Sequence, residues 1–251
     1  MENNMKEILV KSSLDGSMQP SLFYAASGKD RPLLVGLHTW SFDRFNQVEN
    51  MLPHAVANDF NLLLPEFRGP NLPKNPICKE ACGSPLAIAD VFDAIEYVKE
   101  NYGVDENNVF LLGTSGGGHM ALLCGARSPK YFKAIGAFVP VCDLVRWWGE
   151  NKDYAPLIEA CCDGEEDMLR RSPIFYAGAL GEANLKIFHG KFDHGVSYLQ
   201  SFDLYRAIMA AKPDARVFLD IFDGGHHMDM EVAMSWLLSQ YTKKELTAVT
   251  G

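Results

Sequence analysis

The chain lacks the long apolar segments and the excess of positive charge that would suit it to a membrane or to nucleic acid. No uninterrupted apolar run among its 251 residues is long enough to span a bilayer. Its 23 Lys and Arg residues are outnumbered by 32 Asp and Glu residues, which gives a net charge of −9. Nucleic acid and anionic membranes are therefore not expected as partners, because both attract basic surfaces.

The first seven residues are polar and have no apolar stretch of the kind found in a signal peptide. We therefore expect a soluble, cytoplasmic protein whose six cysteines are reduced. Cys78 and Cys82 are separated by three residues, which is not a usual zinc spacing, so no metal is expected. The sequence has no internal repeat and no low-complexity tract.

Apolar segments of strand length alternate with segments of helical spacing. The predicted strands are Lys6–Lys11, Leu22–Ala26, Pro32–His38, Asn61–Leu64, Val109–Thr114, Ala134–Val141, Leu185–His189 and Arg216–Phe222. This alternation predicts an α/β fold with a mostly parallel sheet of about eight strands and helices on both faces. A turn at Asp15-Gly16 joins the first two strands, which indicates an antiparallel edge.

The most distinct predicted helix begins at Ser84-Pro85, a capping serine followed by proline at the first helical position. Gly103 is expected to end it in a left-handed conformation. Further helices are expected around Phe45–Ala55, where Pro53 should kink or restart the helix, and at Val196–Ala211 and Asp229–Tyr241.

Residues 142–184 interrupt the alternation. They contain Trp147, Trp148 and Tyr154 and a short acidic stretch, and the α/β pattern resumes after them. We therefore interpret the chain as one domain, residues 1–251, in which 142–184 form an insertion or cap near the functional site.

The most informative motif is the G-x-S-x-G segment from Gly113 to Gly117, between a predicted strand and a predicted helix. Glycines relieve crowding around a serine on such a sharp turn, which exposes the hydroxyl at the edge of the sheet. The next backbone N–H, on Gly116, lies at a helix start and can stabilise an oxyanion. This context predicts that Ser115 is a nucleophile.

A serine nucleophile needs a histidine base and an acid that orients the base. The candidate base is His226, on the Gly-rich loop after the last predicted strand, and His227 is the competitor. The candidate acid is Asp193, which follows the strand Leu185–His189, and Asp143 is the alternative. The order Ser, acid, His is typical of α/β-hydrolases.

On these residues the chain resembles the α/β-hydrolase superfamily, and most closely the catalytic domain of the prolyl oligopeptidase-like family and its small esterase relatives. The resemblance rests on the segments Gly113–Gly117, His189–Asp193 with Val196, and Gly224–His226, and on Arg171-Ser172-Pro173. It implies the α/β-hydrolase fold and a Ser115–Asp193–His226 triad that works without a cofactor.

The sequence departs from the family in two ways. The family's peptidases usually carry an N-terminal propeller that restricts substrate size, and this chain has no room for one, which favours an ester over a peptide as the substrate. Many related esterases also have a His-Gly-Gly oxyanion loop, whereas this chain reads His38-Thr39-Trp40. We expect the backbone N–H of Thr39 or Trp40 to supply one oxyanion donor and that of Gly116 the other.

These observations predict a serine hydrolase of carboxylic esters, whose partner is a small-molecule ester or short peptide. The alternative is a small peptidase or acyl-amide hydrolase, and a third hypothesis is a non-catalytic binding protein on the same fold. Trp147 and Trp148 are candidates for lining the acyl or alcohol pocket. The sequence does not indicate the oligomeric state.

Overall fold

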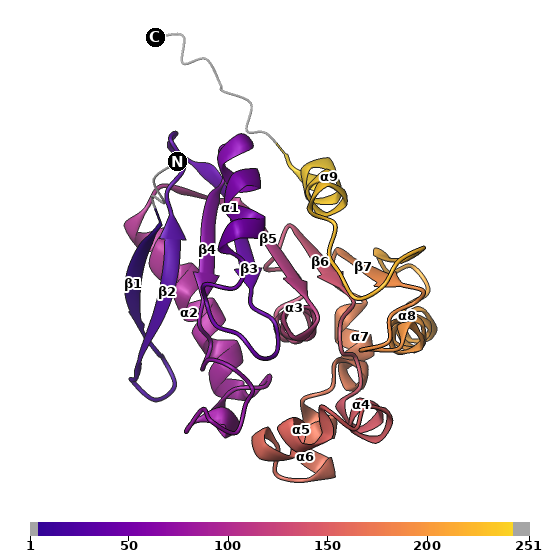
Figure 1. The fold of residues 1–251 in the computed structure, drawn as a ribbon. Coiled ribbons are helices and arrows are strands. Elements are labelled where there is room, and N and C mark those ends of the chain that lie inside the picture. The colour runs from indigo at the N-terminus through magenta and orange to yellow at the C-terminus, as the bar shows by residue number, and fades with distance from the viewer. Residues whose placement is uncertain (1–4, 243–251) are drawn as a thin grey trace, which may run out of the picture.

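The computed structural model describes residues 5–242, and within them the chain forms one sheet flanked by helices (Figure 1). The eight strands of this described part are β1 (Lys6–Lys11), β2 (Met18–Tyr24), β3 (Arg31–Leu37), β4 (Asn61–Pro65), β5 (Val104–Thr114), β6 (Ala134–Phe138), β7 (Leu185–Gly190) and β8 (Val217–Phe222). Their order across the sheet is β1-β2-β4-β3-β5-β6-β7-β8. β2 pairs antiparallel with β1 and with β4, and every other pairing is parallel. The predicted α/β-hydrolase architecture with an antiparallel edge is therefore confirmed.

Helices cover both faces of this sheet. The larger ones are α1 (Val48–Ala57), α2 (Pro85–Asn101), α3 (Gly116–Arg127), α8 (Tyr198–Ala211) and α9 (Met230–Gln240). Buried residues of α2, α3 and α8 share one apolar cluster with the strands, and those of α1 and α9 share another. The strands supply both clusters by alternation: in β3, Leu33 and Val35 enter the first and Leu34 enters the second.

The ends of α2 show one confirmed expectation and one wrong one. The Ser84 side chain accepts a hydrogen bond from the Ala87 N–H, and Pro85 is the first helical residue, as predicted. Gly103, however, does not adopt a left-handed conformation. The extended Tyr102, with φ −138°, leads directly into β5 at Val104, so no left-handed residue is needed. The helix expected around Phe45–Ala55 also differs from the prediction. It begins only at Val48, as α1, and Pro53 lies inside it without restarting it.

Between β6 and β7 the chain forms a group of short helices. They are α4 (Leu144–Glu150), α5 (Ala155–Cys161), α6 (Glu165–Arg170) and α7 (Ala177–Leu180), together with the 3-10 turn η2 (Pro173–Tyr176). A second 3-10 turn, η1 (Cys78–Glu80), contacts α5. In Figure 1, α4, α5 and α6 gather at the lower end of the molecule. That the whole chain is one domain with 142–184 as a cap stays a prediction.

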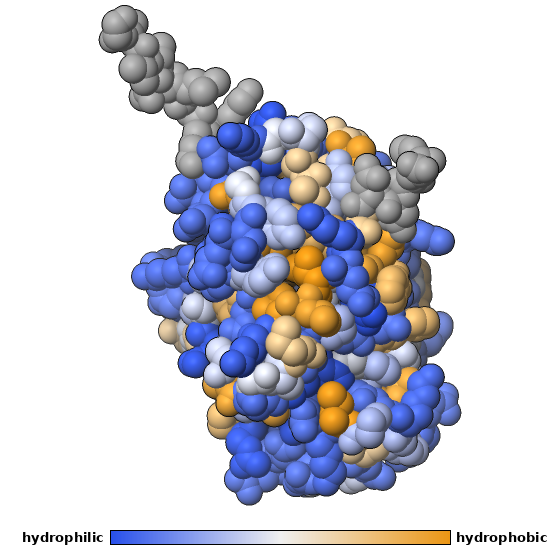
Figure 2. All heavy atoms as spheres, turned by 90° about the vertical axis from the view of Figure 1, so that its left-hand side faces the viewer, coloured by the Kyte–Doolittle hydropathy of each residue, from blue (hydrophilic) through white to orange (hydrophobic). Residues whose placement is uncertain are grey.

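The face on the β1 side is mostly hydrophilic, with apolar residues gathered near its centre (Figure 2). The β1–β2 hairpin contributes exposed apolar side chains, Leu9 and Met18. Among residues 5–242, no helix is long and apolar enough to cross a membrane.

Candidate active site

Ser115 lies on the turn between β5 and α3. Its backbone has φ 55° and ψ −120°, a conformation that few residues other than glycine adopt. The turn is possible only because its neighbours have no side chains. A Cβ on Gly113 would lie 2.1 Å from the Gly117 carbonyl oxygen, and one on Gly117 would lie 2.4 Å from the Leu37 carbonyl oxygen. The glycines of the G-x-S-x-G motif thus allow backbone contacts that hold a partly exposed serine at the end of β5.

The structure brings His226 and Asp193 together. His226 Nδ1 lies 2.6 Å from Asp193 Oδ2. Because an ionised carboxylate only accepts hydrogen bonds, Nδ1 carries the proton and Nε2 is left as the basic nitrogen. The Asp193 side chain is fully buried, whereas that of His226 remains 36% exposed.

Hydrogen bonds decide the charge state of Asp193. Burial by itself would raise the pKa of this carboxyl group. Hydrogen bonds from His189, His226 and the backbone N–H of Val196 outweigh burial and hold the pKa well below its usual range. The backbone N–H groups of Gly195 and Val196 both donate to Oδ1, at 2.8 and 2.9 Å. Asp193 is therefore an anion at neutral pH.

A close approach of two loops places His226 beside this acid. A Cβ on Gly190, the last residue of β7, would lie 2.2 Å from the Gly225 carbonyl oxygen. The Phe192 N–H donates to the Gly224 carbonyl at 2.8 Å. The loop after β8 therefore crosses over the end of β7, which carries His226 toward the middle of the sheet.

A chain of contacts connects this pair with the Ser115 turn. Gly195 lies against the His226 imidazole, and its carbonyl accepts the Trp147 Nε1–H at 2.9 Å. The rings of Trp147 and Trp40 pack edge to face with centroids 5.0 Å apart. A Cβ on Gly116 would lie 2.5 Å from the backbone nitrogen of Trp40. Ser115, Asp193 and His226 thus belong to one contiguous region.

The two expected oxyanion donors after β3 differ in availability. The Thr39 N–H already donates to Asn46 Oδ1 at 3.0 Å. Within residues 5–242, the backbone N–H groups of Trp40 and Gly116 have no hydrogen-bond partner. Their closeness makes these two groups the pair that can converge on one oxygen atom.

The two tryptophans of α4 lie in different surroundings. Trp147 is buried and packs against Trp40 and Tyr154. Trp148 is 36% exposed, and its Nε1–H donates to Glu159 Oε1 on α5 at 2.8 Å. Only Trp147 is connected by contacts to the region of Ser115 and His226.

The other residues singled out in the sequence have structural partners. The Asp143 carboxylate accepts the Arg146 N–H and caps α4. The His227 ring packs against Phe222, and Asp229 rather than His227 caps α9. The His38 ring is buried and stacked on Phe67, and burial lowers its pKa.

Sequence reasoning missed His189, although it belongs to the motif used to locate the acid. Its side chain is fully buried, and Nε2 lies 3.3 Å from Asp193 Oδ2. The available signal was its spacing, since it precedes the acid by four residues at the end of a predicted strand.

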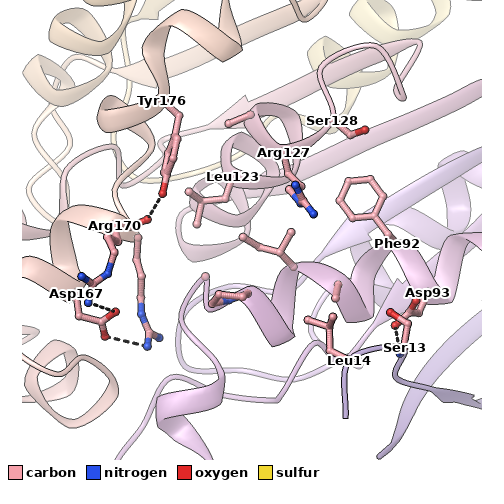
Figure 3. Close-up of a pocket in the computed structure, with 16 residues that line it drawn as sticks. Ser13, Leu14, Phe92, Asp93, Leu123, Arg127, Ser128, Asp167, Arg170 and Tyr176 are labelled. Atoms are coloured by element: carbon pink, nitrogen blue, oxygen red, sulfur yellow. Dashed lines mark hydrogen bonds and ion pairs between the residues drawn. The ribbon is translucent and has the colours of Figure 1, made fainter. Parts of the chain in front are cut away.

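A large cavity lies elsewhere, with a volume of about 940 Å³ (Figure 3). Its walls come from α2, the second half of α3 and α6, and they include Phe92, Leu123 and Arg127. Neither Ser115 nor His226 lines it. In the described part of the chain no group of His, Cys, Asp or Glu side chains could hold a metal ion, and the six cysteines are free and buried.

The chain is similar to known proteins in sequence and in fold. The sequence model of the prolyl oligopeptidase family matches residues 86–246. S-formylglutathione hydrolase of Bos taurus is 39% identical over 54 residues, and that of Rattus norvegicus is 34% identical over 57 residues. These matches cover 21% and 22% of this chain and 19% and 20% of the relatives, so the chain spans about a fifth of their length.

Solved structures share the fold. An acylaminoacyl peptidase of Pyrococcus horikoshii superposes with a TM-score of 0.75 at 18% identity. The superposition covers 96% of this chain and 42% of the peptidase chain. The Pyrococcus furiosus esterase Pf2001 superposes with a TM-score of 0.70 at 16% identity, over 94% of this chain and 89% of its own.

The fold is that of the α/β-hydrolases, with the serine turn at the end of β5. Since the family model covers well over half of the sequence, the chain belongs to the prolyl oligopeptidase family. It is a hydrolase of that family.

The buried His119 on α3 gives a pH-dependent prediction. Burial lowers its pKa from 6.5 to about 4, although Nε2 donates to the Arg171 carbonyl at 2.7 Å. As pH falls, the unfolded chain binds this proton before the folded protein does, so the free energy of unfolding declines between about pH 6.5 and 4. At pH 5 the loss from His119 is on the order of 2 kcal/mol.

His119→Gln keeps a donor for Arg171 but removes the titration. Urea unfolding should therefore show a smaller loss of stability between pH 7 and pH 5 in this variant than in the wild type. His194→Gln, at an exposed position, is the control and should behave like the wild type. Identical pH dependence in all three proteins would contradict the buried, neutral state of His119.

Proposed function

We propose that the protein is a serine hydrolase that cleaves carboxylic esters through an acyl-enzyme intermediate on Ser115. The observation that carries this proposal is the hydrogen-bonded His226–Asp193 pair within the contiguous region that includes the strained Ser115 turn. A partly exposed serine hydroxyl, a histidine with a free Nε2 and a buried carboxylate are the groups that acyl transfer requires.

In the proposed reaction, His226 Nε2 removes the Ser115 hydroxyl proton as Oγ attacks the ester carbonyl carbon. Asp193 accepts the Nδ1–H, and its negative charge stabilises the imidazolium that forms. The carbonyl oxygen becomes an oxyanion, which the N–H groups of Gly116 and Trp40 stabilise. The imidazolium then protonates the departing alcohol, which leaves an acyl group on Ser115.

Water completes the cycle. His226 Nε2 takes a proton from a water molecule, whose oxygen attacks the acyl carbonyl. The second tetrahedral intermediate collapses, the proton passes to Ser115 Oγ, and the carboxylic acid is released. All the proposed groups belong to this chain, so the reaction needs no metal or organic cofactor.

An ester is the substrate class we put first, because an alcohol is a better leaving group than an amine and needs less assistance from the general acid. A peptide or acyl-amide bond is the alternative, and it is the bond implied by the name of the structurally similar acylaminoacyl peptidase. Both reactions use the same groups, so substrate kinetics must separate them.

The nucleophile is tested by Ser115→Ala. Because the proposed triad acts as a unit, turnover of an activated ester should fall by about four orders of magnitude or more. Ser128→Ala, just past the other end of α3, is the matched control and should retain wild-type turnover. A fluorophosphonate probe should label the wild type at Ser115 and leave Ser115→Ala unlabelled.

Three outcomes separate the hypotheses. Wild-type turnover by folded Ser115→Ala would reject the nucleophile, and a wild type that neither labels nor turns over any substrate would indicate a binding protein. An ester and an amide with the same acyl group should differ in kcat/KM in favour of the ester. Equal or faster amide cleavage would replace the ester proposal with the peptidase.

The proposed oxyanion donors are tested by Gly116→Ala. The added Cβ would collide with the Trp40 nitrogen, so the two N–H groups could no longer converge. We expect kcat to fall by about 10²–10³, the typical cost of losing one such donor, with a smaller change in KM. Gly178→Ala, where a Cβ meets nothing within 4 Å, is the control. An unchanged kcat in Gly116→Ala would exclude this pair of donors.

We further propose that Trp147, buried against Trp40, forms a wall of the pocket for the apolar part of the substrate, with a smaller contribution from Trp148. Trp147→Ala should cost a long-chain ester about 1–3 kcal/mol in kcat/KM and an acetyl ester much less. The ratio of the two kcat/KM values is the measurement, because it does not depend on how much enzyme is folded. Trp148→Ala should change this ratio less, and an unchanged ratio in Trp147→Ala would mean that Trp147 serves only as core packing.

A further inference from the structure

His189 is fully buried at the end of β7, behind the carboxylate of Asp193. Its Nε2 lies 2.9 Å from the Val196 carbonyl oxygen and 3.3 Å from Asp193 Oδ2. Its Nδ1 lies 2.7 Å from the Ser201 hydroxyl on α8. The imidazole thus joins the acid and its turn to a neighbouring helix.

For a neutral His189 imidazole, these contacts define the tautomer. Both oxygens near Nε2 are acceptors, so Nε2 must carry the proton. Nδ1 then accepts a hydrogen bond, which only the Ser201 hydroxyl can donate. Were Ser201 absent, the proton could move to Nδ1, and Nε2 would face two acceptor oxygens with no donor between them.

The helix that supplies Ser201 is itself anchored. The adjacent Gln200 is buried, and its Oε1 accepts the N–H groups of Cys142 and Asp143 at 3.0 and 3.1 Å. The Cys142 thiol lies 3.8 Å from the Ser201 hydroxyl. The first turn of α8 is thus tied to the loop after β6, which keeps Ser201 in place.

The titratable groups that face Asp193 come from two elements. They are His189 on β7 and His226 on the loop after β8, and both approach the same oxygen, Oδ2. Cys142, beyond Ser201, is a third titratable group, and burial raises the pKa of its thiol to about 12. Cys142 is therefore neutral near pH 7 and adds no charge.

We propose that His189 is a positioning residue for the acid of the triad. As a neutral Nε2–H donor it holds the 193–196 turn through the Val196 carbonyl, and it draws part of the negative charge of Oδ2 away from His226. The inference rests on the proposed function, because it assigns His189 a task within that same reaction.

The sign of the expected effect follows from the shared oxygen. Removing the His189 donor leaves the whole charge of Asp193 Oδ2 facing His226, which stabilises the imidazolium. A higher pH is then needed to generate the neutral base. The acid-side inflection of the kcat/KM profile, which reports the titration of the base, should therefore move upward.

His189→Leu removes the donor, and we expect the inflection to rise by about 0.5 to 1 pH unit, with a roughly tenfold lower plateau from a less ordered turn. His189→Gln can place an amide N–H near the position of Nε2. Its inflection and its plateau should therefore both lie close to the wild-type values. Ser201→Ala removes the donor to Nδ1, so that the His189 proton is no longer confined to Nε2. The inflection should then shift in the same direction as in His189→Leu, but by less.

Cys142→Ala is the matched control, since it removes a buried group one contact beyond Ser201 and should leave the inflection unchanged. An unmoved or lowered inflection in folded His189→Leu would overturn the inference, as would equal effects of the Leu and Gln variants. Nitrogen-15 NMR at pH 8 should show His189 protonated on Nε2, and the Nδ1–H tautomer would also overturn it.

The His226 titration can be followed by NMR without any substrate, by comparing its midpoint in wild type and His189→Leu. This separates the inference from the proposed function. If Ser115→Ala remains active but the His226 midpoint rises in His189→Leu, the esterase proposal fails and the role of His189 stands. If Ser115→Ala is inactive and the midpoint does not move, only the inference fails.

Discussion

The carboxyl edge of this sheet depends on backbone segments that approach more closely than any side chain would allow. Gly113 and Gly117 let the start of α3 press against the ends of β5 and β3. Gly116 brings this turn against the loop after β3, and Gly190 lets the loop after β8 cross the end of β7. A Cβ at any of these positions would push the facing backbone away, and a Cβ cannot move aside as the end of a long side chain can. Each of these close contacts therefore requires glycine.

Rigid attachment of the acid complements these backbone contacts. Asp193 is buried, yet it remains charged because the His226 imidazole and two backbone N–H groups donate to it and His189 Nε2 lies 3.3 Å from Oδ2. A buried carboxylate with fewer donors would become neutral and would lose its hold on His226. The same principle applies to Arg68, which is buried and paired with Asp15, Glu80 and Asp90. This cluster braces the loop after β4 against α2, so ion pairs as well as apolar contacts hold the fold together.

Much of the sheet could be predicted from the sequence because its signals are local. Buried strands such as β3 and β4 are short apolar runs, and the start of α2 is encoded by Ser84 and Pro85. The candidate site residues were found because a sharp serine turn and a Gly-rich histidine loop also leave local patterns. What could not be predicted depends on distant partners. The engagement of the Thr39 N–H by Asn46, and the partners of His189, arise only when separate loops meet. Gly103 was misjudged because the next strand, rather than the helix end, decides its conformation.

The carbonyl oxygen of Gly195 limits how the segment between β6 and β7 can vary. It accepts hydrogen bonds from two side chains of that segment, Trp147 Nε1–H and Asn151 Nδ2–H, each at 2.9 Å. The N–H of the same residue donates to Asp193. The helical segment between β6 and β7 is therefore joined to the turn that holds the acid. A change in this segment that removes Trp147 or Asn151 also removes a donor from the residue that binds Asp193, so the segment cannot vary independently of the acid.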